Sequence, residues 1–168
     1  MSLWLDGASR VWARLPMRLR VAALRAANHK VTLGVVGVVY DARGRVLVLD
    51  HRFRPRWTWG LPGGFLGPGE PLVAGLVREL REETGLVLDV DPTPLDVEHL
   101  VGPGAVTVTY AARARPTDGG QEGPEGPRLV LCDELRGGGF FAPDALPDGM
   151  YPHHAAIVRR WASARERT

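Results

Sequence analysis

Cysteine and lysine are almost absent from this sequence, with one residue of each, Cys132 and Lys30, among 168. A single thiol cannot form an intrachain disulfide, which is typical of proteins from a reducing compartment, so we expect a cytoplasmic location. Cys132 directly follows the apolar run Leu129–Leu131. This context favours a buried structural thiol over a nucleophile.

Long apolar runs are missing as well. No stretch approaches the ~20 consecutive apolar residues that a bilayer-spanning helix needs, and arginines interrupt every apolar stretch near the N-terminus, so we expect no secretory signal. The hydrophobic content of 45% and the charged content of 24% are ordinary for a globular protein. The length suits one domain with its own core, and the net charge of +2 gives no indication of a nucleic-acid partner.

Charge is distributed unevenly, because the first 30 residues carry a single acidic residue, Asp6. Their cations are Arg10, Arg14, Arg18, Arg20, Arg25 and Lys30. Leu15, Leu19 and Ala22 recur at helical spacing, which predicts a helix over residues 3–28 that Pro16 interrupts or restarts. We therefore expect residues 1–29 to form a basic amphipathic extension. It would pack on the domain or on a second subunit, and contact with an anionic membrane through residues 3–28 is the less favoured alternative.

From residue 30 onward, strand and helix patterns alternate. Val31–Tyr40 is apolar and β-branched, and Arg45–Asp50 predicts a second strand that forms a hairpin with it across the turn at 41–44. A helical pattern runs over Pro71–Thr84 and ends at Gly85. Further predictions are a loop at 54–69, strands at 86–90, 97–100, 105–113, 128–132 and 139–141, an exposed loop at 118–127 and a helix at 152–165. This order favours an α/β sheet with helices on both faces.

The helix predicted at 71–84 carries three carboxylates on one face. With 100° per residue, Glu79, Glu82 and Glu83 share one arc, while Val73, Leu76, Val77, Leu80 and Thr84 form a core-facing arc. Clustered like charges cost about a few tenths of a kcal/mol per pair. A hard divalent cation such as Mg²⁺ would offset this cost. A solvated surface that Arg78 and Arg81 neutralise is the alternative.

A glycine lies within this acidic arc. Gly75 is one turn before Glu79, and helical side chains lean toward the N-terminus, so we expect the Glu79 carboxylate to lie over Gly75. A mid-helix glycine costs about 1 kcal/mol relative to alanine. The glycine would make room for a metal ion or for the preceding loop, or it would pack closely on Gly63 and Gly64.

The segment Gly64–Leu86 resembles the Nudix box. Gly64 and Glu70 are followed by Arg-Glu-Leu-Arg-Glu-Glu-Thr-Gly-Leu at 78–86, which fills every fixed position of that motif. The segments Trp59–Gly64 and Phe140–Pro147 are similar to the usual lead-in and late segment of the family. The resemblance extends from about Lys30 to about Trp161, and it leaves the N-terminal 29 residues uncovered.

The resemblance implies a fold, a metal and a set of roles. The fold would be an α/β/α sandwich with a mixed sheet, and the cofactor Mg²⁺, with Mn²⁺ as a substitute. Glu79, Glu82 and Glu83 would be the metal ligands, and Arg78 would orient a box glutamate through an ion pair. Glu70 would support the loop–helix–loop or assist metal binding through water, and Gly64 and Gly85 would permit the turns at its ends. The general base would be a box glutamate or a later one, for which the candidates are Glu122, Glu125 and Glu134.

The implied reaction is hydrolysis of a pyrophosphate bond in a nucleoside diphosphate derivative, with ADP-ribose-like compounds and nucleoside triphosphates as candidate substrates. An RNA 5′-pyrophosphohydrolase and a non-catalytic nucleotide sensor are the alternatives. Substrate phosphates could bind to Arg52, Arg54 and Arg56. Trp57 or Trp59 could stack on a base, or Trp59 could pack in the core. Phe140 and Phe141 present a similar choice, and His153 and His154 are predicted to be surface residues. A homodimer is expected because the family often dimerises.

Overall fold

The computed structural model describes residues 12–27, 31–100, 104–115, 123 and 126–167. The chain divides into two compact units, residues 1–31 and 32–168. In the first unit a helical piece at 12–14 is separated by Leu15 and Pro16 from α2 (Met17–Ala27). This confirms the predicted interruption at Pro16, whereas residues 3–11 and 28 of the predicted helix lie outside the described part. Met17 and Leu24 are exposed on α2.

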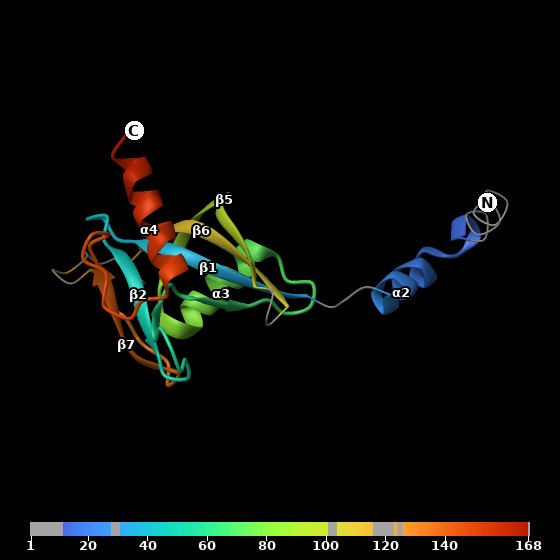
Figure 1. Ribbon diagram of the computed structural model, residues 1–168, viewed down its shortest axis with the longest axis horizontal. Coiled ribbons are helices and arrows are strands. Elements are labelled where there is room, and N and C mark those ends of the chain that lie inside the picture. The colour runs from blue at the N-terminus through green and yellow to red at the C-terminus, as the bar shows by residue number, and fades with distance from the viewer. Residues whose placement is uncertain (1–11, 28–30, 101–103, 116–122, 124–125, 168) are drawn as a thin grey trace. The chain divides into compact units, whose positions relative to one another are not determined.

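The second unit is built on a seven-stranded mixed sheet with strand order β3-β2-β1-β6-β5, in which β4 also pairs with β1 and β7 with β2 (Figure 1). The strands are β1 (Thr32–Tyr40), β2 (Val46–His51), β3 (Trp59–Gly60), β4 (Gly63–Phe65), β5 (Val87–Leu100), β6 (Ala105–Arg115) and β7 (Leu135–Phe141). The helices are α3 (Leu72–Thr84) and α4 (Pro152–Arg165). The predicted α/β class is confirmed.

The hairpin predicted between β1 and β2 exists only at its closed end. The two strands pair antiparallel at Tyr40 and Val46 and then separate. Beyond that point β4 pairs with β1 on one side, with Val35 opposite Gly64, and β6 runs parallel to β1 along its whole length on the other. β2 pairs instead with β3 and β7. The divergence brings the loop before α3 against the middle of β1.

Several predicted boundaries are wrong, and pairing partners distant in sequence explain the differences. The predicted loop at 54–69 contains β3 and β4, which are short because each pairs with only two or three residues. The pieces at 86–90 and 97–100 belong to one strand, β5, whose pairing with β6 is irregular near Pro94. Residues 128–132 form no strand. Their backbone is bound to the end of α3, where Val130 N–H donates to Thr84 O and Cys132 N–H to Glu83 O.

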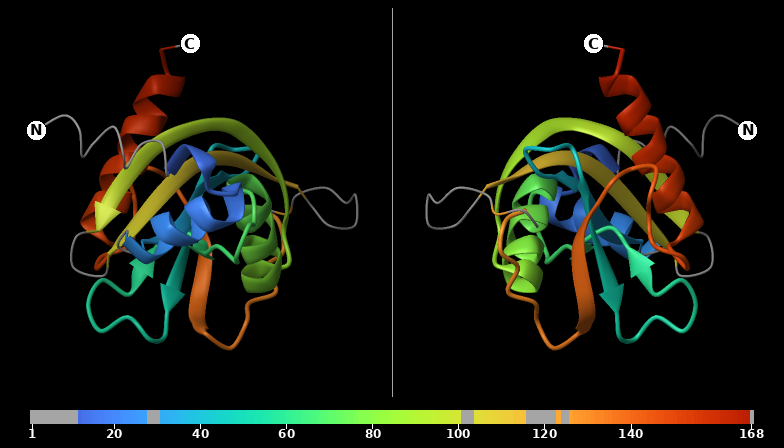
Figure 2. Two further views of the ribbon diagram at one scale, coloured as in Figure 1. Left: turned by 90° about the vertical axis from the view of Figure 1, so that its right-hand side faces the viewer. Right: turned by 90° about the vertical axis from the view of Figure 1, so that its left-hand side faces the viewer.

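Two core clusters lie on the two faces of the sheet, because alternate residues of β1 point in opposite directions. Val35 and Val39 pack with Leu76 and Leu80 of α3, while Val38 belongs to the cluster built around α4. Figure 2 shows α3 and α4 on opposite sides of the sheet, which confirms the α/β/α sandwich. Cys132 is half-buried against the α3 cluster. None of the described helices is long and apolar enough to cross a membrane.

Candidate active site on the α3 face

The amphipathic pattern of α3 orients the site. Leu76, Leu80 and Thr84 are fully buried, and Val73 and Val77 of the predicted core face are half-buried. The helix ends at Gly85, whose φ of 71° is left-handed and whose N–H donates to Arg81 O. With this face fixed on the sheet, the carboxylates of α3 are directed toward the loop that precedes the helix.

Arg78 connects three carboxylates of the motif. Its guanidinium binds Glu70 bidentately at 2.8 and 2.9 Å, and it donates to Glu79 Oε1 at 2.9 Å and to Glu82 Oε2 at 3.2 Å. Glu70 also accepts from Gly67 N–H at 2.8 Å. The bonds from Arg78 and then Gly67 lower the pKa of Glu70 to about 2. Arg78 and Glu70 thus fix the loop to the helix, as the resemblance implied.

The Glu79 carboxylate lies against Gly64 rather than over Gly75, where it was predicted. A Cβ at Gly64 would lie 2.4 Å from Glu79 Cδ, so only glycine leaves space for this carboxylate. A Cβ at Gly75 would meet Leu66 Cδ2 at 2.1 Å and Glu70 at 3.4 Å. Gly75 therefore makes room for the preceding loop, and the predicted alternative of packing on Gly63 and Gly64 is wrong.

Glu83 is partly buried beside Glu79, with one carboxylate oxygen 3.2 Å from the donating N–H of Gly63. Burial raises the pKa of Glu83 to about 7, and the negative charges of Glu79 and Glu134 act in the same direction, while the Gly63 bond and the charge of Arg54 oppose it. A carboxylate with a raised pKa next to a second carboxylate is an environment that a bound cation would relieve.

The carboxylates fit a hard divalent cation incompletely. Glu79 and Glu83 supply oxygen donors of the type that Mg²⁺ prefers. The side chain of Glu82 is 61% exposed and is bound to Arg78, so it would join them only after leaving that ion pair. Accordingly, the described residues contain no group of three or more Asp, Glu, His or Cys side chains that is arranged to hold a metal ion.

Of the three candidate bases beyond the motif, the structure describes only Glu134. Its side chain is exposed, and its charge acts on Glu83. Glu122 and Glu125 lie outside the described residues. Arg52 is next to the same segment, since its N–H donates to Glu134 O at 2.9 Å and its Nε to Asp133 O at 3.1 Å.

A cavity of about 290 Å³ opens beside the carboxylates. Its lining includes Gly63, Gly64, Arg54 and Arg56, whereas Arg52 is not part of it. Burial lowers the pKa of Arg54, while the charge of Glu83 raises it. Arg54 forms no ion pair with any residue that the structure describes. The cavity lining is therefore cationic at Arg54, whose charge interacts with that of Glu83.

Aromatic rings line the same cavity, and of the two candidate stacking residues Trp57 lines it while Trp59 does not. Trp57 and Tyr151 both line it, with ring centroids 5.6 Å apart, and the guanidinium of Arg56 lies 4.3 Å from the Trp57 ring. Trp59 packs instead edge-on against Phe141 in the α4 cluster, which corrects its placement among the substrate contacts. Phe140 and Phe141 are both half-buried, in different clusters.

The start of α4 carries residues that sequence reasoning missed. His154, predicted to be on the surface, is 6% exposed and its Nδ1 accepts from Leu61 N–H at 3.1 Å. Burial and the charge of Arg54 lower the pKa of His154 to about 3. His153 binds Asp96 at 2.9 Å, and Tyr151 OH donates to Glu98 at 3.0 Å. No sequence signal connected Glu98 with residues more than fifty positions away.

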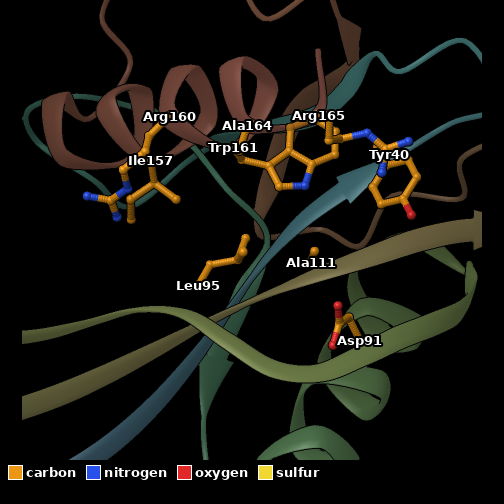
Figure 3. Close-up of a pocket in the computed structure, with 9 residues that line it drawn as sticks. All are labelled: Tyr40, Asp91, Leu95, Ala111, Ile157, Arg160, Trp161, Ala164 and Arg165. Atoms are coloured by element: carbon orange, nitrogen blue, oxygen red, sulfur yellow. The ribbon is translucent and has the colours of Figure 1, made fainter. Parts of the chain in front are cut away.

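A separate cavity of about 550 Å³ lies on the α4 face of the sheet (Figure 3). Figure 3 shows Trp161 and Arg165 of α4 facing Leu95 and Ala111 of β5 and β6 across it. The Arg165 guanidinium lies 4.6 Å from the Tyr40 ring. None of the predicted site residues lines this cavity, whereas the cavity beside Gly64 is lined by the two glycines that Glu79 and Glu83 contact.

Comparison with known proteins agrees with this arrangement. Residues 30–161 match the NUDIX domain family. A mouse protein named 8-oxo-dGDP phosphatase NUDT18 is 35% identical over 105 residues, which cover 62% of this chain and 29% of that protein. Mouse nucleoside diphosphate-linked moiety X motif 6 is 44% identical over 61 residues, which cover 36% of this chain and 19% of that protein. The chain thus matches less than a third of the length of either relative.

Solved structures show the same fold. A NUDIX hydrolase from Nitrosomonas europaea superposes with a TM-score of 0.69 at 19% identity, covering 83% of this chain and 74% of that one. A MutT NUDIX hydrolase from Burkholderia pseudomallei has a TM-score of 0.60 at 27% identity, covering 78% and 98%. Because the family match at residues 30–161 covers more than half of the sequence, this chain belongs to the NUDIX domain family.

Proposed function

We propose that this protein hydrolyses a pyrophosphate bond in a nucleoside diphosphate derivative and depends on Mg²⁺, with Mn²⁺ as a substitute. The observation that carries the proposal is the junction at Gly63–Gly64. On one side Glu79 and Glu83 contact these glycines, and on the other side the glycines line the cavity with Arg54 and Arg56. A substrate bound in the cavity would therefore present its phosphates to the carboxylates.

The metal would be held by Glu79 and Glu83, with Glu82 as a third ligand once it releases Arg78. When bound, a metal of this kind neutralises phosphate charge and lowers the pKa of an attacking water. Arg78 positions Glu79 from the side, because its guanidinium is itself anchored by Glu70. Loss of Arg78 would leave the fold intact and the ligand poorly oriented.

Arg54 and Arg56 are the proposed phosphate-binding residues. A guanidinium presents several N–H donors in a planar fork that matches phosphate oxygens. Arg54 has a lowered pKa because burial removes it from water, and an anion would compensate for that desolvation. Arg52 remains a weaker candidate, since its donors are directed to Asp133 and Glu134.

Glu134 is the proposed general base. Its exposed carboxylate acts electrostatically on Glu83 and forms no ion pair within the described part of the chain, so it is free to accept a proton from an attacking water. Glu134→Gln is expected to lower kcat with little change in KM. An unchanged kcat would move the role of base to a glutamate of the motif.

Relatives bearing the names 8-oxo-dGDP phosphatase and nucleoside diphosphate-linked moiety X motif support a nucleoside diphosphate substrate. ADP-ribose-like compounds, nucleoside triphosphates and 5′-triphosphate RNA belong to the same test. Homodimerisation and a cytoplasmic location, which are expected from the family and from the cysteine content, stay predictions.

The test is release of nucleoside monophosphate or phosphate from these compounds with and without Mg²⁺. Glu83→Gln is the matched inactive variant and Asp89→Asn, an exposed acid-to-amide change on β5, is the control. Metal-dependent cleavage that Glu83→Gln abolishes and Asp89→Asn retains would support the proposal. Tight binding of a nucleotide without cleavage of any compound would instead favour a sensor.

A further inference from the structure

The cavity beside Gly64 is lined by charged residues of both signs. Arg54 and Arg56 are its cationic lining residues, and Glu98 of β5 is its single carboxylate. A series of contacts connects the two signs of charge: Arg56 lies over the Trp57 ring, Trp57 lies beside Tyr151, and Tyr151 OH donates to Glu98. The lining thus offers cations, aromatic surface and one carboxylate as an anionic hydrogen-bond acceptor. These match the phosphates, the flat ring and a donor-bearing edge of a nucleotide.

Glu98 is held in place by its neighbours. Its side chain is 18% exposed, Oε1 accepts from Tyr151 OH at 3.0 Å, and Oε2 is 3.7 Å from His153 Nε2. His153 is in turn bound to Asp96. A carboxylate has about four acceptor positions, and these contacts use only part of them. Glu98 therefore keeps acceptor capacity in a cavity that has no other carboxylate among its lining residues.

We propose that Glu98 selects a guanine-type base, accepting two parallel hydrogen bonds from the ring N1–H and the exocyclic N2–H of that base. Guanine and 8-oxoguanine both carry these adjacent donors. Adenine presents a ring acceptor at N1 beside its exocyclic N–H, so the carboxylate would repel it. The proposal rests on the proposed function, since it takes the nucleotide phosphates to bind to Arg54 and Arg56.

The aromatic walls support this placement. Trp57 has a φ of 53°, which bulky residues rarely adopt, and it is the one non-glycine residue with a positive φ in the described part of the chain. Such a conformation persists only where the surroundings enforce it, and such residues cluster at binding sites. With Arg56 stacked on one region of the ring, Trp57 is held near Tyr151. A base that lies against the Trp57 ring and beside Glu98 would be both stacked and hydrogen-bonded.

The size of the cavity sets a limit on the ligand. Complete small-molecule sites commonly measure about 300–1,000 Å³, and this one measures about 290 Å³. It therefore accommodates the nucleoside part, while a distal phosphate group and anything attached to it would extend past Gly64 toward Glu79 and Glu83. Selection by Glu98 thus concerns the base and is independent of the group beyond the pyrophosphate.

The experiment compares guanine and adenine nucleotides in the wild type, Glu98→Gln and Asp89→Asn. The readouts are kcat/KM with Mg²⁺ for GDP, 8-oxo-dGDP and ADP, and metal-free affinity for GMP and AMP by calorimetry. A correctly paired base edge is worth about 10- to 100-fold in discrimination. We expect the wild type to favour guanine by that factor. Glu98→Gln should remove or reverse the preference, because an amide pairs with adenine, and Asp89→Asn should retain it.

The outcomes separate the two proposals. If no nucleotide is hydrolysed but GMP binds better than AMP in a Glu98-dependent manner, the hydrolase proposal fails and base selection stands. If nucleotides are hydrolysed with equal preference for both bases, or with a guanine preference that Glu98→Gln leaves unchanged, base selection fails and the hydrolase proposal stands. Tyr151→Phe, which keeps the ring and removes the hydroxyl, should weaken the preference less than Glu98→Gln does.

Discussion

Gly64→Ala is expected to inactivate the protein without unfolding it. A Cβ at this position lies 2.4 Å from Glu79 Cδ and 2.6 Å from both carboxylate oxygens, whereas ordinary contact begins at 3.4 Å. The carboxylate must therefore withdraw by about 1 Å, which a flexible side chain can do at small cost to folding. A displacement of about 1 Å in a catalytic group can reduce the rate by about 10²-fold. We expect kcat/KM to fall by that factor.

Gly137→Ala on β7 is the matched control, because its added Cβ meets no heavy atom within 4 Å. Steady-state hydrolysis with Mg²⁺ and thermal unfolding would be measured for both variants. Gly137→Ala should keep wild-type kinetics, and the midpoint of Gly64→Ala should change by no more than a few degrees. Wild-type turnover in Gly64→Ala would refute the assignment of Glu79 as a ligand that needs this position, and a collapsed midpoint would assign Gly64 to folding.

Three other substitutions test the roles of Glu83, Arg78 and His154. Glu83→Gln should lower turnover by orders of magnitude while far-UV circular dichroism and the unfolding midpoint stay near wild type, and near-normal turnover would remove Glu83 from the site. Arg78→Ala should reduce kcat more than stability, since it releases Glu79; a large loss of stability with normal turnover would contradict this. His154 has a pKa near 3 when folded and about 6.5 when unfolded, so the unfolded state binds more protons between these values and acid destabilises the protein. The control is His154→Asn, which keeps an acceptor for Leu61 N–H. Relative to this variant, the wild type should lose up to about 1.4 kcal/mol of unfolding free energy per pH unit below 6.5, as measured by urea denaturation. A difference in unfolding free energy between the two proteins that does not change with pH would contradict the buried neutral imidazole.

Local sequence patterns were enough to predict those helices and strands whose signal lies within their own residues. The period of α3 follows from spacing along one helix, whereas the ion pair of Arg78 with a motif glutamate was implied by the resemblance to the Nudix box. The helix at 152–165 was predicted with the observed bounds. By contrast, β4 is only three residues long and exists because β1 diverges from β2. No pattern inside 63–65 could reveal that partner.

The substrate-facing residues depended on contacts across the fold. Trp57 and Trp59 are two positions apart and chemically equivalent in the sequence, and only the pairing of β3 with β2 assigns Trp59 to the core. Likewise the pairing of Tyr151 with Glu98 requires α4 to begin beside β5. His154 was misplaced because its acceptor role is satisfied by a backbone N–H of a distant loop. Tertiary contacts therefore determine which residues line the cavity, whereas α3 could be predicted from its own sequence.

The parallel pairing of β1 with β6 has a consequence for how the chain acquires its structure. Thr32 pairs with Ala105 and Tyr40 with Arg113, so the central strand obtains one complete edge only after two-thirds of the chain is present. Pairing between segments so distant carries a large loop-closure cost and slows folding. During synthesis the apolar segment Val35–Val39 must remain unpaired on that edge until β6 emerges. A ribosome-bound fragment that ends before residue 105 should consequently expose this strand to chaperones and to aggregation.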